Sequence, residues 1–171
     1  KVNISNLDFG DAFNDPEDLF DYPTLLSHDG ARHIVDPEGP VLGWDIDTET
    51  DGQPTVLNEA IGDDLAGKDD EDGIFLLDPL IAGNEVRLLV NVTNAGGYFH
   101  GWMDFNGDLE WDDDGEQIVF DGVPGSPLLG VGTHTLTFEV PQSAPAGPTS
   151  LRFRITSDDA LLTTRGLAPD G

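Results

Sequence analysis

Hydrophobic and polar positions alternate strictly in three segments of the second half of the chain. Apolar side chains, mostly Val, Leu, Ile and Phe, occupy every second position there, and the positions between them are mainly polar. This period of two is the pattern of a β-strand with one buried and one exposed face. The sequence therefore predicts strands at 86–93, 135–140 and 151–156.

Shorter apolar segments predict further strands, and turn-forming clusters separate them. The additional candidates are 74–77, 98–105 and 117–120. Residues 94–97 and 122–127 are rich in Gly, Pro and Asn, which favour turns. Several short strands with such turns indicate an all-β fold, which we expect to be an antiparallel β-sandwich.

The first part of the chain carries loop signals instead. Residues 1–73 contain Asp-Pro, Tyr-Pro, Asp-Gly and Gly-Pro steps, which mark turns. One helical turn is expected at 15–19, where Pro16 follows the capping residue Asp15. We predict a single domain over 1–171, loop-rich over 1–73 and strand-rich over 74–171, with long calcium-binding loops and little helix.

Charge narrows the range of partners. The chain has 34 Asp and Glu against 7 Lys and Arg, a net charge of −27. Nucleic acid and anionic membranes are therefore poor partners. No apolar run approaches the roughly 18 residues of a membrane span, so no insertion is expected. With no cysteine, disulfides and thiolate metal sites are excluded.

A compact fold with this much like charge repels itself. Divalent cations would neutralise two charges each, and calcium is abundant outside cells. The alternative is a salt-adapted, solvated acidic surface. That alternative does not explain why the acids cluster in loops together with Gly and Asn.

The strongest metal-binding pattern spans 104–116. Side-chain oxygens occur at every second position in Asp104, Asn106 and Asp108; Glu110 follows two positions later, where its main-chain oxygen is available, and Glu116 closes the segment. The spacing resembles an EF-hand loop, although Gly107 sits two positions early and no helices flank it. We predict a calcium site here; the alternative is a solvated acidic hairpin tip.

Other acidic loops predict further calcium ions. Six acids lie within ten residues just before the strand at 74–77, and a shared cation would relieve their repulsion. A third loop has acids at every second position, a pattern that a strand face would also give. A fourth, weaker pair could complete another loop's site. The predicted ligands are Asp63, Asp64, Asp69, Asp70 and Asp72; Asp45, Asp47, Glu49 and Asp51; and Asp8 and Asp11.

Calcium is favoured over magnesium because these loops offer many protein oxygens, whereas magnesium keeps several of its waters. We therefore predict several Ca²⁺ ions.

Short motifs follow one another along nearly the whole chain: Asp-Phe-Gly-Asp-Ala at 8–12, Tyr-Pro-Thr-Leu-Leu at 22–26, Gly-Ala-Arg-His at 30–33, Asp-Gly-Gln-Pro at 51–54, Gly-Asp-Asp at 62–64, Asp-Asp-Glu-Asp-Gly at 69–73, Asn-Ala-Gly-Gly-Tyr at 94–98, Gly-Trp-Met-Asp-Phe-Asn-Gly-Asp at 101–108, Gly-Glu-Gln-Ile at 115–118 and Leu-Arg-Phe-Arg at 151–154. In these motifs and their order the chain resembles the GEVED domain, a module of large secreted and surface proteins of bacteria. The family's closing Gly-Glu-Val-Glu-Asp segment has no counterpart here. If those acids are ligands, one site is expected to be incomplete.

A narrower resemblance is to the calcium-dependent peptide-binding domains of giant bacterial repeat (RTX) adhesins. It implies an extracellular domain, monomeric within a larger chain, that holds the C-terminus of a peptide or protein on a host or neighbouring cell through a bound calcium. Arg32 and His33 could assist by pairing with a carboxylate, and Trp44 and Trp111 could form a contact wall. Arg32 pairing within its own loop, and tryptophan packing in the core, are the structural alternatives.

Two other functions remain as alternatives. A structural spacer would bind calcium only for rigidity, with no open coordination position. An enzyme is not predicted, because the sequence has no zinc-protease histidine spacing, no Gly-x-Ser-x-Gly and no phosphate loop, and acids this dense suit cations better than a tuned acid–base pair.

Overall fold

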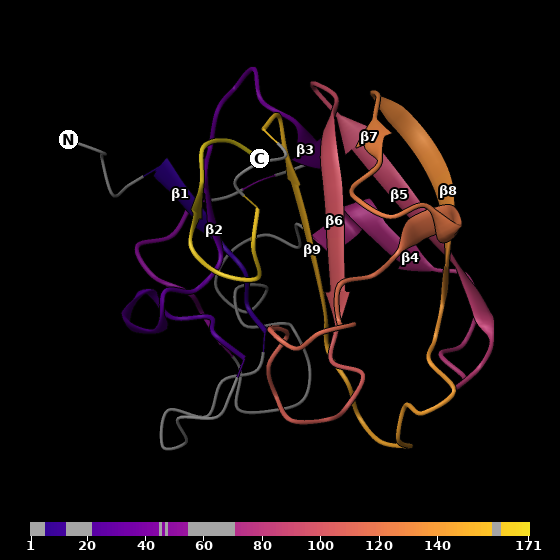
Figure 1. Cartoon of the computed structure of the whole chain (residues 1–171). Coiled ribbons are helices and arrows are strands. Elements are labelled where there is room, and N and C mark those ends of the chain that lie inside the picture. Colours follow the sequence, from indigo (N-terminus) through magenta and orange to yellow (C-terminus); the bar gives the residue numbers. More distant parts are fainter. Residues whose placement is uncertain (1–5, 13–21, 45, 47, 55–70, 159–161) are drawn as a thin grey trace.

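The protein is built from three small β-sheets arranged as layers (Figure 1). The computed structural model describes residues 6–12, 22–44, 46, 48–54, 71–158 and 162–171, and the structural statements below refer to these residues. The helical elements named among them are short 3-10 turns: η2 (Leu26–His28), η3 (Glu71–Gly73) and η4 (Phe120–Gly122). The predicted all-β sandwich with little helix is confirmed. The helical turn expected at 15–19 lies outside the described residues.

Two of the sheets form the sandwich. One is built around β5 (Glu85–Thr93), which pairs with β8 (Gly132–Glu139) on one side and with β3 (Val41–Leu42) and β4 (Ile74–Leu76) on the other. The second has β6 (Gly97–Met103) between β7 (Leu128–Leu129) and β9 (Leu151–Thr156). All of these pairings are antiparallel, as predicted.

The main core lies between these two sheets and follows the alternating pattern of the sequence. The even-numbered apolar residues of β5, from Val86 to Val92, are fully buried. Their partners across β8 are apolar where the face is buried, since Val86 lies opposite Phe138 and Leu88 opposite Leu136. Phe99 of β6 stacks on Phe153 of β9, with 5.6 Å between ring centroids. Burial of this apolar face is the main contribution to the stability of the sandwich.

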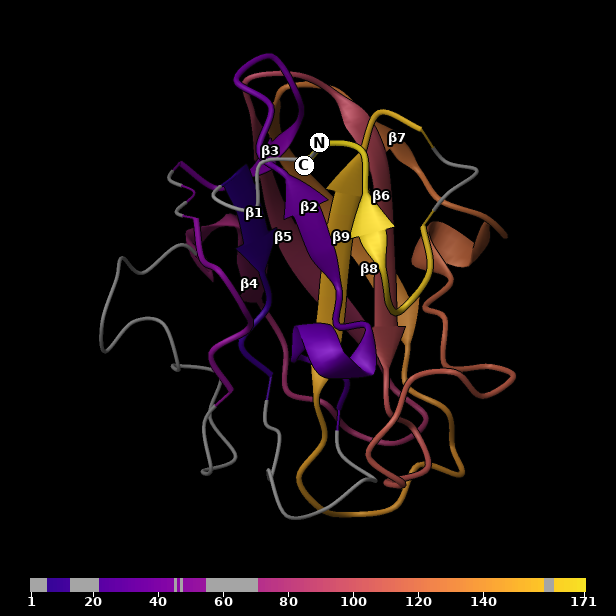
Figure 2. The ribbon, with the colours of Figure 1, turned by 90° about the vertical axis from the view of Figure 1, so that its left-hand side faces the viewer.

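The opposite face of β9 differs from the sequence prediction. Arg152, Arg154 and Thr156 were expected to face solvent, but their exposed fractions are only 6%, 3% and 0%. A third sheet covers this face (Figure 2), and the arginines remain there because backbone carbonyls accept their N–H groups. In β9, the alternation of apolar and polar residues therefore corresponds to two buried faces. One face is apolar, and the polar groups of the other are hydrogen-bonded.

The covering sheet corrects the prediction that 1–73 is irregular. Its central strand is β2 (Arg32–Ile34), which pairs antiparallel with β1 (Leu7–Phe9) and parallel with β10 (Leu167–Ala168). These strands are too short for a period-two signal. Residues 117–120 also differ from prediction, because only Gln117 forms a bridge, to Trp102, before η4 begins.

The Arg154 side chain joins the covering sheet to the sandwich. Its Nη1 donates to the carbonyls of Thr163 and Arg165, and its Nη2 donates to those of Arg32 and Gly166, at 2.7–3.1 Å. Its Nε donates to His33 Nε2 at 3.0 Å. A planar guanidinium can make all these bonds at once, whereas a lysine ammonium cannot.

We expect Arg154→Lys to lower the free energy of unfolding by about 3 kcal/mol, because several buried carbonyls lose their donor. Urea denaturation measures this loss. The matched control is Arg87→Lys, since Arg87 is exposed and pairs only with Asp78, and its midpoint should stay close to that of the wild type. Similar losses in both variants would contradict the role given to Arg154.

Candidate functional site

The loop at 104–116 brings three carboxylates together at the end of β6. Oxygens of Asp104, Asp108 and Glu116 all lie within 4.8 Å of one another. Asp104 and Glu116 are each 2% exposed, whereas Asp108 faces solvent. The loop closes where Met103 N–H donates to the carbonyl of Glu116 at 3.0 Å. These are three of the ligands that the spacing predicts, and the structure groups them.

Only neutral groups donate the hydrogen bonds observed to the two buried carboxylates. Asp104 accepts from the N–H groups of Gly107 and Leu109 and from the Tyr22 hydroxyl, at 2.5–3.0 Å. Glu116 accepts from the N–H groups of Phe105 and Asp113 at 3.2 and 3.3 Å. Burial, together with the nearby charges of Asp104 and Asp108, raises the pKa of Glu116 to about 7. The cluster therefore concentrates negative charge that a cation would stabilise.

The backbone of this loop holds a conformation that is unusual outside glycine. Gly107 has φ +83°, which glycine adopts freely, but Leu109 has φ +72°. A leucine at positive φ is strained, and such strain concentrates at functional sites. Here it places the Leu109 N–H against Asp104 Oδ2. The hydrogen bond that this conformation allows helps to hold Asp104 in position and offsets part of the strain.

A second acidic group adjoins the first. Oxygens of Asp108, Glu110 and Asp113 also lie within 4.8 Å of one another. Asn106 donates to Asp108 at 3.0 Å and to Asp113 at 2.8 Å. Asp113 is absent from the ligands predicted from sequence, because in the run 112–114 spacing alone does not show which acid turns inward.

Not every acid of the loop is available to a cation. Asp112 Oδ2 lies 2.6 Å from Arg165 Nη2, and its other oxygen accepts from Thr164. The Glu110 carboxylate is 3.8 Å from the same guanidinium. Arg165 therefore offsets charge on Asp112 and Glu110, and its ion pairs within the described residues do not include the buried carboxylates Asp104 and Glu116.

Trp111 lies inside the protein rather than on a contact wall. It is 2% exposed, stacks on Tyr22 with ring centroids 4.2 Å apart, and lies beneath the Arg152 guanidinium at 4.2 Å. Its Nε1 donates to the carbonyl of Ser150. Its predicted role in contacting a partner is wrong, because almost none of its surface is accessible. It packs the loop at 104–116 onto the body of the protein.

The other predicted acidic loops have different outcomes. Asp63, Asp64, Asp69, Asp70, Asp45 and Asp47 lie outside the described residues. Asp72 accepts from the Trp44 N–H at 3.0 Å, and Asp51 accepts from Leu26 N–H at 2.6 Å. Glu49 is buried and accepts from Phe9 N–H. In the described part of the chain, these three carboxylates each accept a backbone hydrogen bond, and none of them belongs to a cluster of three converging acids.

Asp8 and Asp11 lie in a different part of the structure from the loop at 104–116. The negative charge of Asp8 interacts electrostatically with Arg154, and that of Asp11 interacts with Arg152, in each case favouring the charged guanidinium. Both acids line a cavity of about 330 Å³ together with those arginines. The structure thus associates this pair with buried guanidinium groups and not with the three carboxylates at the end of β6.

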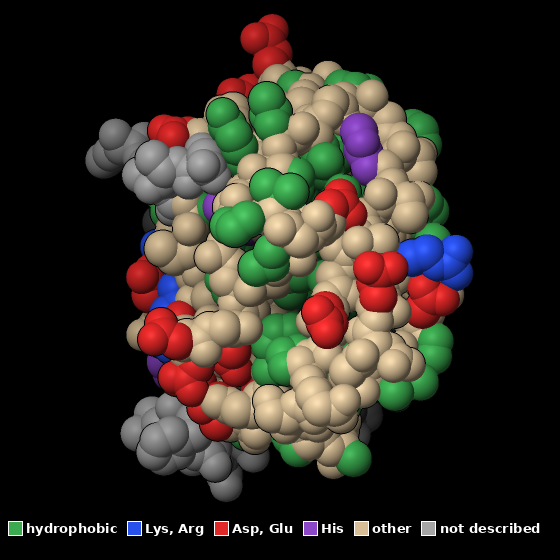
Figure 3. All heavy atoms as spheres, turned by 45° about the vertical axis from the view of Figure 1, so that its right-hand side comes forward, with side chains coloured by type: hydrophobic (Ala, Val, Ile, Leu, Met, Phe, Trp, Pro, Cys, Tyr) green, Lys and Arg blue, Asp and Glu red, His purple; other side chains and the backbone are tan. Residues whose placement is uncertain are grey.

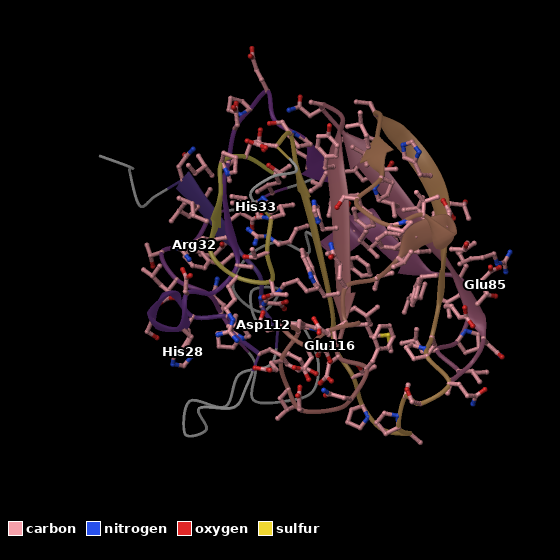
Figure 4. The ribbon with its side chains drawn as sticks, in the orientation of Figure 1. His28, Arg32, His33, Glu85, Asp112 and Glu116 are labelled. Atoms are coloured by element: carbon pink, nitrogen blue, oxygen red, sulfur yellow. The ribbon has the colours of Figure 1, made fainter. Side chains whose placement is uncertain are left out.

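The predicted carboxylate-pairing residues lie apart from that cluster as well. Figure 4 shows Arg32 and His33 on the covering sheet, away from Glu116. Arg32 pairs with Asp29 at 2.9 Å within its own loop, which was the structural alternative. His33 contacts Arg154 through Nε2 and the Asp170 carbonyl through Nδ1. Trp44 is 73% exposed and remains available to a partner.

A second hollow, of about 400 Å³, adjoins the loop at 104–116. Its lining includes Gly115 and Gln117, the two neighbours of Glu116, along with apolar Ile118 and Phe138. Acidic residues Glu85, Asp121 and Glu139 also line it. Figure 3 shows acidic and hydrophobic side chains side by side on the surface. The hollow thus borders residues that flank Glu116 in sequence, and none of the three clustered carboxylates lines it.

The comparisons with known proteins support one family. Residues 98–171 match the family model described as the GEVED domain. This span runs from β6 through the carboxylate loop and β9 to β10. Over these residues the match agrees with the resemblance seen in the sequence, and the motifs at 8–73 lie outside it. No curated protein and no solved structure matches the chain.

We expect His33 to make stability depend on pH. Burial, followed by the Arg154 charge, lowers the pKa of His33 from 6.5 to about 3. Between these pH values the unfolded chain binds a proton at His33 and the folded protein does not. The contribution of neutral His33 to the free energy of unfolding is therefore fully present above pH 6.5 and is lost as the pH falls towards 3. The loss should be about 1.4 kcal/mol per pH unit. Urea denaturation between pH 6 and 4 should show a shallower slope for His33→Gln; identical slopes would contradict this assignment.

Proposed function

We propose that this chain, whose residues 98–171 match the GEVED domain family model, is a calcium-dependent ligand-binding module of a bacterial surface adhesin. In this proposal it captures the C-terminus of a peptide or protein through a bound calcium ion. The observation that carries the proposal is the convergence of Asp104, Asp108 and Glu116, two of them buried, within 4.8 Å.

Calcium suits this arrangement better than other ions. It is a hard cation that takes six to eight oxygen ligands in flexible geometry. The loop offers the three carboxylates, the Asn106 side chain and main-chain carbonyls, and it contains no sulfur or imidazole ligand. Bringing buried carboxylates together without a cation is costly, because their mutual repulsion adds to their desolvation.

The accessible side of the cluster supports ligand capture. Asp104 and Glu116 lie inside while Asp108 faces solvent, so an ion held by all three would keep one side open. A carboxylate from a partner could complete its coordination there. The hollow beside Gly115 and Gln117 would receive the residues that precede that carboxylate.

The cation is also the means by which an acidic protein could attract an anionic group. With a net charge of −27, the protein repels carboxylates over most of its surface. An extracellular location agrees with a calcium requirement, because free calcium is abundant there. No helix in the described residues is both long and apolar enough to cross a membrane.

A calcium-stabilised spacer is the second candidate, and one contact favours it. The Tyr22 hydroxyl donates to Asp104 at 2.7 Å and therefore joins the metal loop to a segment far away in sequence. In a spacer, calcium would fix this junction and take no external ligand. The binding experiment below distinguishes the two functions.

We expect Glu116→Gln to weaken calcium binding by about ten-fold or more, because the loop loses a charged ligand. Isothermal titration calorimetry measures the affinity and the number of ions. Asp114→Asn is the matched control, since Asp114 is exposed in the same loop but lies outside the converging groups, and it should bind as the wild type does. Unchanged binding in Glu116→Gln would exclude this loop as the calcium site.

Calcium at about 100 times its Kd should raise the free energy of unfolding by roughly 2.7 kcal/mol per site.

A peptide array with free and amidated C-termini tests ligand capture. We expect binding only to free C-termini, only with calcium, and not by Glu116→Gln. Equal binding to amidated peptides would reject carboxylate capture, and a melting temperature unaffected by EDTA would reject the calcium requirement.

A further inference from the structure

We propose that the cavity beneath the covering sheet is a second binding site, separate from the calcium loop, which takes a small carboxylate with an apolar body through Arg152. The cavity has a volume of about 330 Å³, within the usual size of small-molecule sites. Residues of β1, β2, β3, β4 and β9 line it.

The Arg152 side chain has one nitrogen that its structural contacts leave unused. Its Nη1 donates to the carbonyls of Pro23 and Thr164, at 3.0 and 2.7 Å. Its Nη2 is buried and has no hydrogen-bond partner, in a residue only 6% exposed. A buried charged donor without an acceptor costs free energy, so an anion at this point would be stabilised.

That nitrogen lies close to Gly10 in the wall of the cavity. Both residues line the cavity, and a Cβ added to Gly10 would lie 3.9 Å from Nη2, with no other atom of the described, non-adjacent residues within 4 Å. Nη2 itself has less than 1 Å² of accessible surface, so a ligand carboxylate at this position would reach it after a small rotation of the guanidinium. The carboxylate would then accept a charge-assisted hydrogen bond.

The other charged groups around the cavity limit what can bind. Arg154 uses its nitrogens on carbonyls and on His33, and burial beside Arg154 lowers the pKa of His33, which keeps that ring neutral at pH 7. Asp8 and Asp11 also line the cavity and have interactions of their own. Two acids so close disfavour a polyanion such as phosphate, and they restrict the ligand to one negative charge.

The rest of the lining favours a hydrocarbon body. Apolar side chains from the covering sheet and from both sheets of the sandwich line much of it, among them Phe9, Leu42, Ile74, Leu151, Phe153 and Ile155. A short alkanoate would place its chain against these residues and its carboxylate at Arg152. We therefore choose hexanoate as the probe and hexanamide as its uncharged counterpart.

The test is titration of the calcium-loaded protein with each probe, followed by ¹⁵N NMR. We expect hexanoate to shift the amide signals of the cavity glycines Gly10, Gly73 and Gly171. Hexanamide should bind at least about ten-fold more weakly, because it lacks the charge-assisted hydrogen bond. Arg152→Gln should lose the preference for the acid. Equal binding of acid and amide by the wild type would overturn the proposal.

One further variant keeps the test decisive. Arg152→Gln could disturb packing against Trp111, so Gly10→Ala provides a variant whose new methyl meets Nη2 at an ordinary contact distance. It should fold normally and weaken hexanoate binding by about three-fold or more. Shifts confined to the loop at 104–116 would assign the probe to that loop and reject the second site, whereas shifts at Gly10, Gly73 and Gly171 together with failed peptide capture would reject only the adhesin function.

Discussion

The buried guanidinium of Arg154 is the interaction on which the three-layer architecture depends. A sandwich of two small sheets would leave the polar face of β9 in water. Arg154 instead donates to carbonyls before β10 and in β2, and to the His33 ring. Desolvation lowers the pKa of this guanidinium to about 10, so it stays charged at neutral pH. The covering sheet is therefore attached mainly through polar contacts, whereas the sandwich beneath it is held by apolar burial.

The carboxylate loop is supported from the same face. Trp111 lies between Tyr22 and the Arg152 guanidinium, and the Tyr22 hydroxyl donates to Asp104. Burial beside Asp104 raises the pKa of Tyr22 well above its usual range, so the hydroxyl keeps its proton and remains a donor. Arginine, tryptophan, tyrosine and aspartate thus form one continuous stack from β9 to the candidate metal centre. Support of this kind positions ligands more sharply than a loop can alone.

The parts of this structure that depend on local pattern could be predicted, and the parts that depend on distant pairing could not. The alternation in β5, β8 and β9 gave the strands and the core residues, and the spacing of Asp104, Asp108 and Glu116 gave the cluster. Spacing could not show that Asp112 pairs with Arg165, because these residues meet only in the fold. Nor could it reveal that Arg152 and Arg154 are buried, since a polar residue in a strand usually faces water. The covering sheet escaped prediction because its strands have only two or three residues.

The pairing of β2 has a consequence for the order in which the chain folds. Its neighbours β1 and β10 come from opposite ends of the described sequence, so the covering sheet can close only after almost all of the chain has been synthesised. Contacts so distant in sequence form late, because the entropy of loop closure must be overcome first. Until then the arginine face of β9 lies open to solvent. We therefore expect closure of this sheet to be a late step of folding, and it is the step that buries Arg152 and Arg154 and forms the cavity beside them.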